Sequence, residues 1–182
     1  MNSSDLVMLA LECGAAKAVL LDQSQLVTSP LFRDICRNNG CGQYGRCWVC
    51  PPEIGEIDRL IQSLGAYKTI LWYQSIAPIE DSFDIEGMFD AAHSHAQLSQ
   101  RISTALTNHG YAGFLHLSCG GCFLCARCTM PDGIPCRHPE QAISSLEGYG
   151  VDVYSTTKNT PLSYINGENT VTYFGAVFFT EE

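Results

Sequence analysis

Long hydrophobic runs are absent from this sequence. Among its 182 residues, no apolar stretch approaches the roughly 20 residues that a membrane-spanning helix needs. The N-terminal region contains Asp5 and Glu12 and lacks the basic segment that begins a secretory signal peptide. We therefore expect a cytoplasmic protein without a membrane segment.

Positive charge is also scarce. The chain has 10 Lys and Arg against 19 Asp and Glu, which gives a formal net charge of −9. Binding to nucleic acid requires a basic surface, so we expect no nucleic-acid partner. An acidic surface suits cationic partners, or it serves only to keep the protein soluble. The oligomeric state is left open.

Several catalytic motifs are missing as well. There is no H-E-x-x-H sequence, no phosphate-binding glycine loop and no nucleophile elbow. No catalytic residue can therefore be assigned, and the sequence leaves open whether the protein is an enzyme.

Cysteine, in contrast, is abundant, with ten residues of which nine fall into two groups. The first cysteine group comprises Cys36, Cys41, Cys47 and Cys50. The second cysteine group comprises Cys119, Cys122, Cys125, Cys128 and Cys136. Close spacing favours metal chelation over disulfide bonds, which join more distant residues. The tenth, Cys13, lies on the apolar side of a predicted helix and is interpreted as a small buried hydrophobe.

Hydrophobic periodicity predicts an alternation of strands and helices. The predicted strands are residues 17–22, 69–76, 114–119, 151–155 and 171–179. The predicted helices are residues 5–14, 30–36, 52–64, 86–108 and 139–149. We expect an α/β or α+β fold, a single domain over residues 1–182 with helices on a central sheet and two cysteine-rich metal-binding loops.

The second cysteine group contains a C-x2-C-x2-C run, which is typical of 4Fe-4S clusters. Such a cluster normally takes four thiolates, and five are available here. Side chains alternate along a strand, so Cys119 would continue the apolar face of Leu115 and Leu117 and be packed there. The four remaining residues are the predicted cluster ligands: Cys122, Cys125, Cys128 and Cys136.

Zinc is the alternative for this second group. Zinc sites use two C-x2-C pairs or mixtures of Cys and His at longer separations, and His138 could substitute as a ligand. The uninterrupted C-x2-C-x2-C run favours an iron–sulfur cluster over zinc.

The first cysteine group is less regular and fixes no single geometry. Either four thiolates hold a closed second site, or three do and one metal position stays open. An open position can bind a substrate, as it does at catalytic zinc.

Two parts of the chain, residues 27–52 and 120–152, resemble a bacterial and archaeal family of predicted metal-binding proteins that is common in anaerobes. The resemblance rests on Arg33, Cys36, residues 39–45 (Asn-Gly-Cys-Gly-Gln-Tyr-Gly), Trp48, residues 50–52 (Cys-Pro-Pro), Gly121, Cys122, Cys125, Cys128, residues 135–140 (Pro-Cys-Arg-His-Pro-Glu), Glu147 and residues 150–153 (Gly-Val-Asp-Val).

This resemblance implies a set of metal ligands but no reaction. In the second group it implies the four ligands already chosen. In the first group the family pattern has three cysteines, which match Cys36, Cys41 and Cys50. The positions of Cys47 and Cys119 vary in the family pattern. The resemblance thus favours a first site with three thiolates.

Three functions remain. The first is a redox accessory protein that carries electrons through one or two 4Fe-4S clusters to a redox partner protein. The second is an enzyme whose three-cysteine cluster has an open iron. The third is a structural zinc protein.

Overall fold

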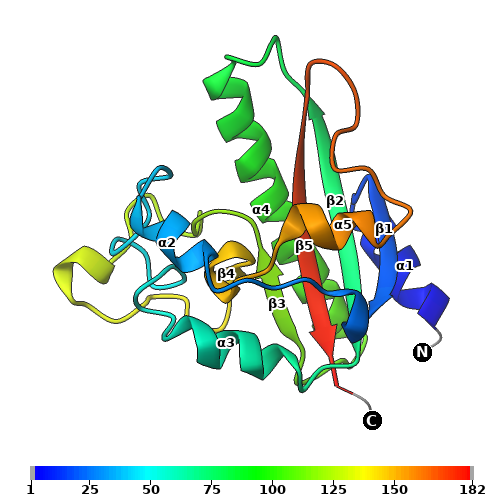
Figure 1. Cartoon of the computed structure of the whole chain (residues 1–182), viewed down its shortest axis with the longest axis horizontal. Helices are drawn as coiled ribbons and strands as arrows, with labels where there is room; N and C mark the ends of the chain where they lie inside the picture. Colours follow the sequence, from blue (N-terminus) through cyan, green and yellow to red (C-terminus); the bar gives the residue numbers. More distant parts are fainter. Residues whose placement is uncertain (1–2, 181–182) are drawn as a thin grey trace.

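A five-stranded mixed sheet forms the centre of the computed structural model, which describes residues 3–180 (Figure 1). The strands are β1 (Lys17–Asp22), β2 (Thr69–Pro78), β3 (Leu115–Ser118), β4 (Ser144–Ser145) and β5 (Thr170–Phe179). Their order across the sheet is β1-β2-β5-β3-β4. Neighbouring strands are antiparallel except β3 and β4, which are parallel.

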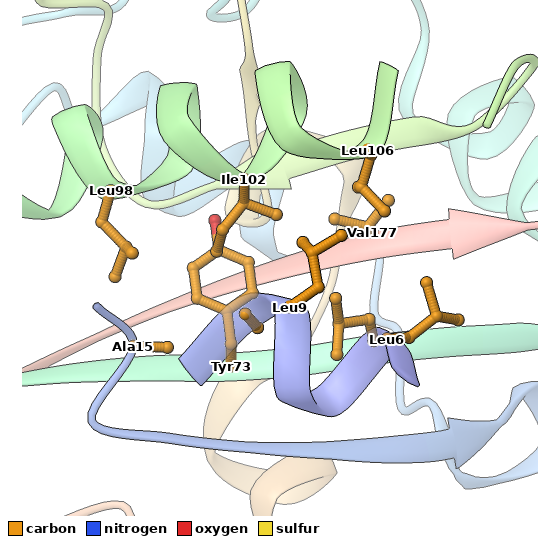
Figure 2. Packing of buried hydrophobic residues seen from close by; sticks show 10 residues of the cluster. Leu6, Leu9, Ala15, Tyr73, Leu98, Ile102, Leu106 and Val177 are labelled. Carbon is orange, nitrogen blue, oxygen red and sulfur yellow. The ribbon is translucent and has the colours of Figure 1, made fainter. Parts of the chain in front are cut away.

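Two helices cover one face of the sheet. They are α1 (Ser3–Glu12) and α4 (Ile85–Asn108), and Asp84 caps α4 by accepting a hydrogen bond of 2.8 Å from the Gly87 amide. Leu9 of α1 and Ile102 of α4 pack with Tyr73 of β2 in one hydrophobic core (Figure 2). Cys13 packs against this core, as the sequence predicts.

The second face carries shorter elements. They are the helices α2 (Phe32–Arg37), α3 (Ile57–Leu64) and α5 (Val153–Lys158), with three 3₁₀ turns η1 (Gln23–Gln25), η2 (Met130–Asp132) and η3 (Glu147–Tyr149) in the connections. Leu64, Leu117 and Leu146 belong to the hydrophobic core on this side. The expectation of an α+β fold with helices on a central sheet is confirmed.

Two predicted elements are wrong. Residues 139–149 are not a helix, because residues 144–145 pair with β3 and the chain then turns through η3. Residues 151–155 are not a strand, because the Asp152 carboxylate caps α5 by accepting a hydrogen bond from the Ser155 amide (2.9 Å). In both segments a tertiary contact or a cap outweighs the local pattern. The helix predicted from residue 52 begins only at Ile57.

Among residues 3–180, no helix combines the length and the apolar character that crossing a membrane would require.

Candidate metal centres

The two cysteine groups meet in space, although they lie far apart in the sequence. The first group runs from α2 into the loop before α3, and the second occupies the loop between β3 and β4. These loops lie side by side beyond the sheet (Figure 1). Cys47 is almost fully buried, and its thiol contacts Cys50 of its own group and Cys122 of the second group. Cys47 therefore joins the two groups.

Polar contacts hold these loops in place. The Asn39 side chain accepts a hydrogen bond from the Tyr44 amide (2.9 Å), and the Gly45 amide donates to the Pro51 carbonyl (2.9 Å). The Trp48 indole N–H donates to the Ile134 carbonyl (3.0 Å), which fastens the first loop to the second. The loops are thus fixed by their own backbone and by one aromatic anchor.

The four predicted ligands of the second group surround one small cavity of about 20 Å³. Its cysteines are Cys122, Cys125, Cys128 and Cys136, together with Cys47 from the first group. The Cys136 sulfur accepts a hydrogen bond from the His138 amide (3.4 Å). Amide contacts of this kind orient metal-bound thiolates and tune the metal. We call the four residues Cys122, Cys125, Cys128 and Cys136 the second centre.

The three predicted ligands of the first group line a larger cavity of about 520 Å³. Cys36 comes from the last turn of α2, Cys41 from the exposed tip of the following loop, and Cys50 from its buried end. We call these three residues the first centre. The cavity also takes in Cys119 and Glu147.

Glu147 carries part of the family resemblance, but the sequence analysis does not assign it to either site. It begins η3, in the segment that the sequence predicts as a helix, where a Glu would ordinarily be a surface residue. Burial raises the pKa of its carboxyl group, and the backbone amides of Glu147 and Gly120 oppose this effect. Its charge also contributes to raising the pKa of the Cys36 thiol, for which burial is the larger cause. The cavity therefore contains a carboxyl group whose pKa burial raises.

Arg33 places a buried positive charge behind the first centre. Only 4% of the residue is exposed, and its guanidinium donates a single long hydrogen bond (3.4 Å) to the Gly148 carbonyl. Its Nε atom has no partner, and within residues 3–180 no carboxylate forms an ion pair with it. Arg33 lowers the pKa of Cys36, against the effect of burial. A buried cation normally requires a compensating anion, which a set of thiolates would provide.

The three contacting thiols do not ionise alike. The interactions with the Cys122 and Cys50 thiols lower the pKa of Cys47. The pKa values of Cys50 and Cys122 are raised, first by the same interactions and then by burial. Since metals bind thiolates, occupation of either centre would have to displace these protons.

Cys119 does not pack as the sequence predicts. It lies one residue beyond β3, and the hydrophobic core around Leu117 does not include it among the described residues. Its thiol instead makes a polar contact with the Ser118 hydroxyl and lines the large cavity. The strict alternation of a strand does not extend past Ser118, because the backbone turns at Gly120 with a φ of 68°.

The donor set of these cavities suits a soft metal. Thiolates select zinc, copper(I) and iron–sulfur clusters over hard cations. Within the described part of the chain, no three His, Cys, Asp or Glu side chains are gathered closely enough to hold a single metal ion. The case for a soft metal at these cavities therefore rests on the chemistry of the thiols and on the positive charge of Arg33.

A family model described as "Predicted metal-binding protein (DUF2284)" matches residues 19–179, which include both cysteine groups. No curated protein and no solved structure is significantly similar to the chain. Because the match covers most of the sequence, the chain belongs to this family of predicted metal-binding proteins.

Proposed function

We propose that the protein binds iron–sulfur clusters and passes electrons to a redox partner protein. Cys122, Cys125, Cys128 and Cys136 would hold a 4Fe-4S cluster at the second centre. Cys36, Cys41 and Cys50 would hold another at the first centre, with one iron left without a thiolate. A cluster supplies one-electron redox chemistry when it is bound.

The contact of Cys47 with both Cys50 and Cys122 is the observation that carries this proposal. Cys50 belongs to the first centre and Cys122 to the second, so a single buried sulfur spans the two. Electron transfer between redox centres falls steeply with distance, and adjacent centres exchange electrons rapidly. A junction that would place two clusters side by side therefore favours electron transfer over a purely structural zinc site.

The charges around the first centre support the same function. The buried Arg33 guanidinium has no ion pair among the described residues and would offset the negative charge of a thiolate-bound cluster. Zinc is the alternative, with His138 available beside Cys136 as a further ligand, although the His138 side chain is exposed.

Anaerobic purification tests the proposal directly. We expect a brown protein that absorbs broadly near about 400 nm and contains iron and acid-labile sulfide. A colourless protein that contains zinc would refute the iron–sulfur assignment and support the structural alternative. We propose that the protein acts in the cytoplasm of an anaerobe, and we infer neither a nucleic-acid nor a membrane partner.

A second candidate function is that of an enzyme. It rests on the cavity of about 520 Å³ beside the first centre, because ligand pockets typically have this size. An iron without a thiolate could bind a small substrate there. Adding sulfide or a small thiol to the reduced protein would then change its EPR spectrum, and an unchanged spectrum would favour electron transfer alone.

A further inference from the structure

A continuous chain of hydrogen bonds runs through the core between the sheet and α4. Ser103 contacts His116 Nδ1 (2.6 Å), and His116 Nε2 contacts the Tyr73 hydroxyl (2.8 Å). Tyr73 donates to Ser99 (2.7 Å), and Ser99 contacts Ser118 (2.9 Å). Figure 2 shows the Tyr73 hydroxyl directed toward α4. Except for Ser103, all of these residues are at least nine-tenths buried.

The two ends of this chain open onto different cavities. Ser103 is partly exposed and lines a surface cavity of about 400 Å³ together with His116. At the other end, Ser99, Ser118 and Cys119 line a small cavity of about 70 Å³ together. Cys119 lines the cavity of about 520 Å³ that also holds Glu147 and the first centre. The chain thus connects the surface with the cavity beside the first centre.

We propose that Ser103, His116, Tyr73, Ser99 and Ser118 form a proton relay that ends at Cys119 and supplies protons to the large cavity. Cys119 donates its S–H proton to a basic group in the cavity, and each hydroxyl and the imidazole passes one proton forward. His116 accepts a proton at Nδ1 and releases one from Nε2. In total, one proton moves from solvent to the cavity, and no covalent bond other than those to hydrogen changes.

The protonation states of the relay groups suit this task. Burial lowers the pKa of His116 to about 3, so the imidazole is neutral near pH 7 and has one donor and one acceptor nitrogen. Burial also raises the pKa of the Cys119 thiol, which therefore carries a proton to donate. Ser99 has a single hydroxyl proton, which points to the His95 carbonyl (3.0 Å) and has to rotate toward Ser118 for each transfer.

A neighbouring pair shows what a purely structural contact looks like. Ser75 contacts His95 Nδ1 (2.7 Å) on the same side of the sheet, but no hydrogen-bond partner for His95 Nε2 lies among residues 3–180. This pair ends in the core, whereas the relay continues to a cavity at both ends. The Ser75 and His95 pair therefore offers a matched control.

Hydrogen–deuterium exchange of the Cys119 thiol tests the relay. The infrared S–H band of Cys119 is identified by its loss in Cys119→Ala, and its decay is followed after transfer into D₂O. We expect the exchange to be at least tenfold slower in Ser99→Ala and in Tyr73→Phe than in wild type. We expect no change in Ser75→Ala. Tyr73→Phe keeps the ring, so it serves if Ser99→Ala does not fold.

Equal exchange rates in wild type and in the relay variants would overturn the proposal, because cavity water would then reach Cys119 directly. Equal slowing in Ser75→Ala would overturn it as well, because the cause would be a general loss of core mobility. The use of the relay in redox chemistry rests on the proposed function. The exchange measurement does not need bound metal. A result that refutes the relay therefore leaves the proposed function open, and a result that refutes metal binding leaves the relay open.

Discussion

The thiols of Cys47 and Cys122 are in contact, although each belongs to a different cysteine group. The sequence spacing within each group predicts ligands but cannot reveal this contact, because it depends on how two loops fold against each other. The Trp48 indole, which donates to Ile134 of the second loop, is part of what sets that arrangement. The redox predictions below follow from this junction between the centres.

The first prediction concerns magnetic coupling between the centres. Since Cys47 touches both Cys50 and Cys122, two reduced clusters would lie close enough for their electron spins to interact. We expect the EPR spectrum of the fully reduced protein to show splitting or broadening that the half-reduced protein lacks. Two simple signals that add without interaction would contradict adjacent centres.

The second prediction is that Cys50→Ser removes the first centre and leaves the second. Cys50 is a proposed ligand on the wall of the large cavity, and the four cysteines of the second centre do not include it. We expect iron and sulfide to fall by roughly half, as one of two 4Fe-4S clusters is lost. Cys119→Ser is the control and should keep the full metal content. Loss of all iron in Cys50→Ser would show that the groups form one site.

Much of the fold could be predicted because its elements are long and periodic. The strand at residues 17–22 and the long helix α4 are predicted from their hydrophobic patterns, and the structure contains both. The segment 139–149 was missed because its apolar spacing resembles that of a helix, whereas Ser144 and Ser145 pair with β3. The local hydrophobic pattern cannot reveal this parallel pairing with β3, because the two segments are far apart in the sequence.

The candidate site divides in the same way. The cysteines are recognisable from their spacing alone, and their ligand roles remain predictions. Glu147 and Arg33 could not be assigned a role from the residues, because their importance depends on burial beside the first centre. A buried charge without a partner is invisible in a sequence that contains many ordinary charged residues.

The third prediction concerns Arg33, which lies buried behind the first centre. Replacing it in Arg33→Leu removes a positive charge that would stabilise the reduced, more negative cluster. We expect the reduction potential of the first centre to become more negative, on the order of 100 mV for a unit charge at an effective dielectric constant near 20. Redox titration followed by EPR measures the shift.

Arg37→Leu is the matched control for this measurement. Arg37 lies on the same helix, but it is exposed and forms an ion pair with Asp34 (2.7 Å). Solvent screens such a surface pair, so we expect a much smaller shift. Equal shifts in the two variants would mean that net charge, rather than the buried position of Arg33, sets the potential.

The fourth prediction is a loss of stability in mild acid caused by two buried histidines. Burial lowers the pKa of His95 to about 4 and that of His116 to about 3, whereas an unfolded histidine has a pKa near 6.5. The unfolded state therefore binds more protons below about pH 6.5. The stability due to these two residues is complete above that pH and is lost as the pH falls toward 4.

Well below pH 6.5, each histidine should lower the free energy of unfolding by about 1.4 kcal/mol per pH unit, and near pH 6.5 by about half of that. We expect the free energy of unfolding of wild type in urea to fall by roughly 3 kcal/mol between pH 6.5 and pH 5 from the two together. His116→Asn should remove about half of this pH-dependent loss, whatever the metal contributes, because the metal ligands are the same in both proteins. An identical pH dependence in wild type and His116→Asn would show that burial does not lower the pKa of His116 in the folded protein.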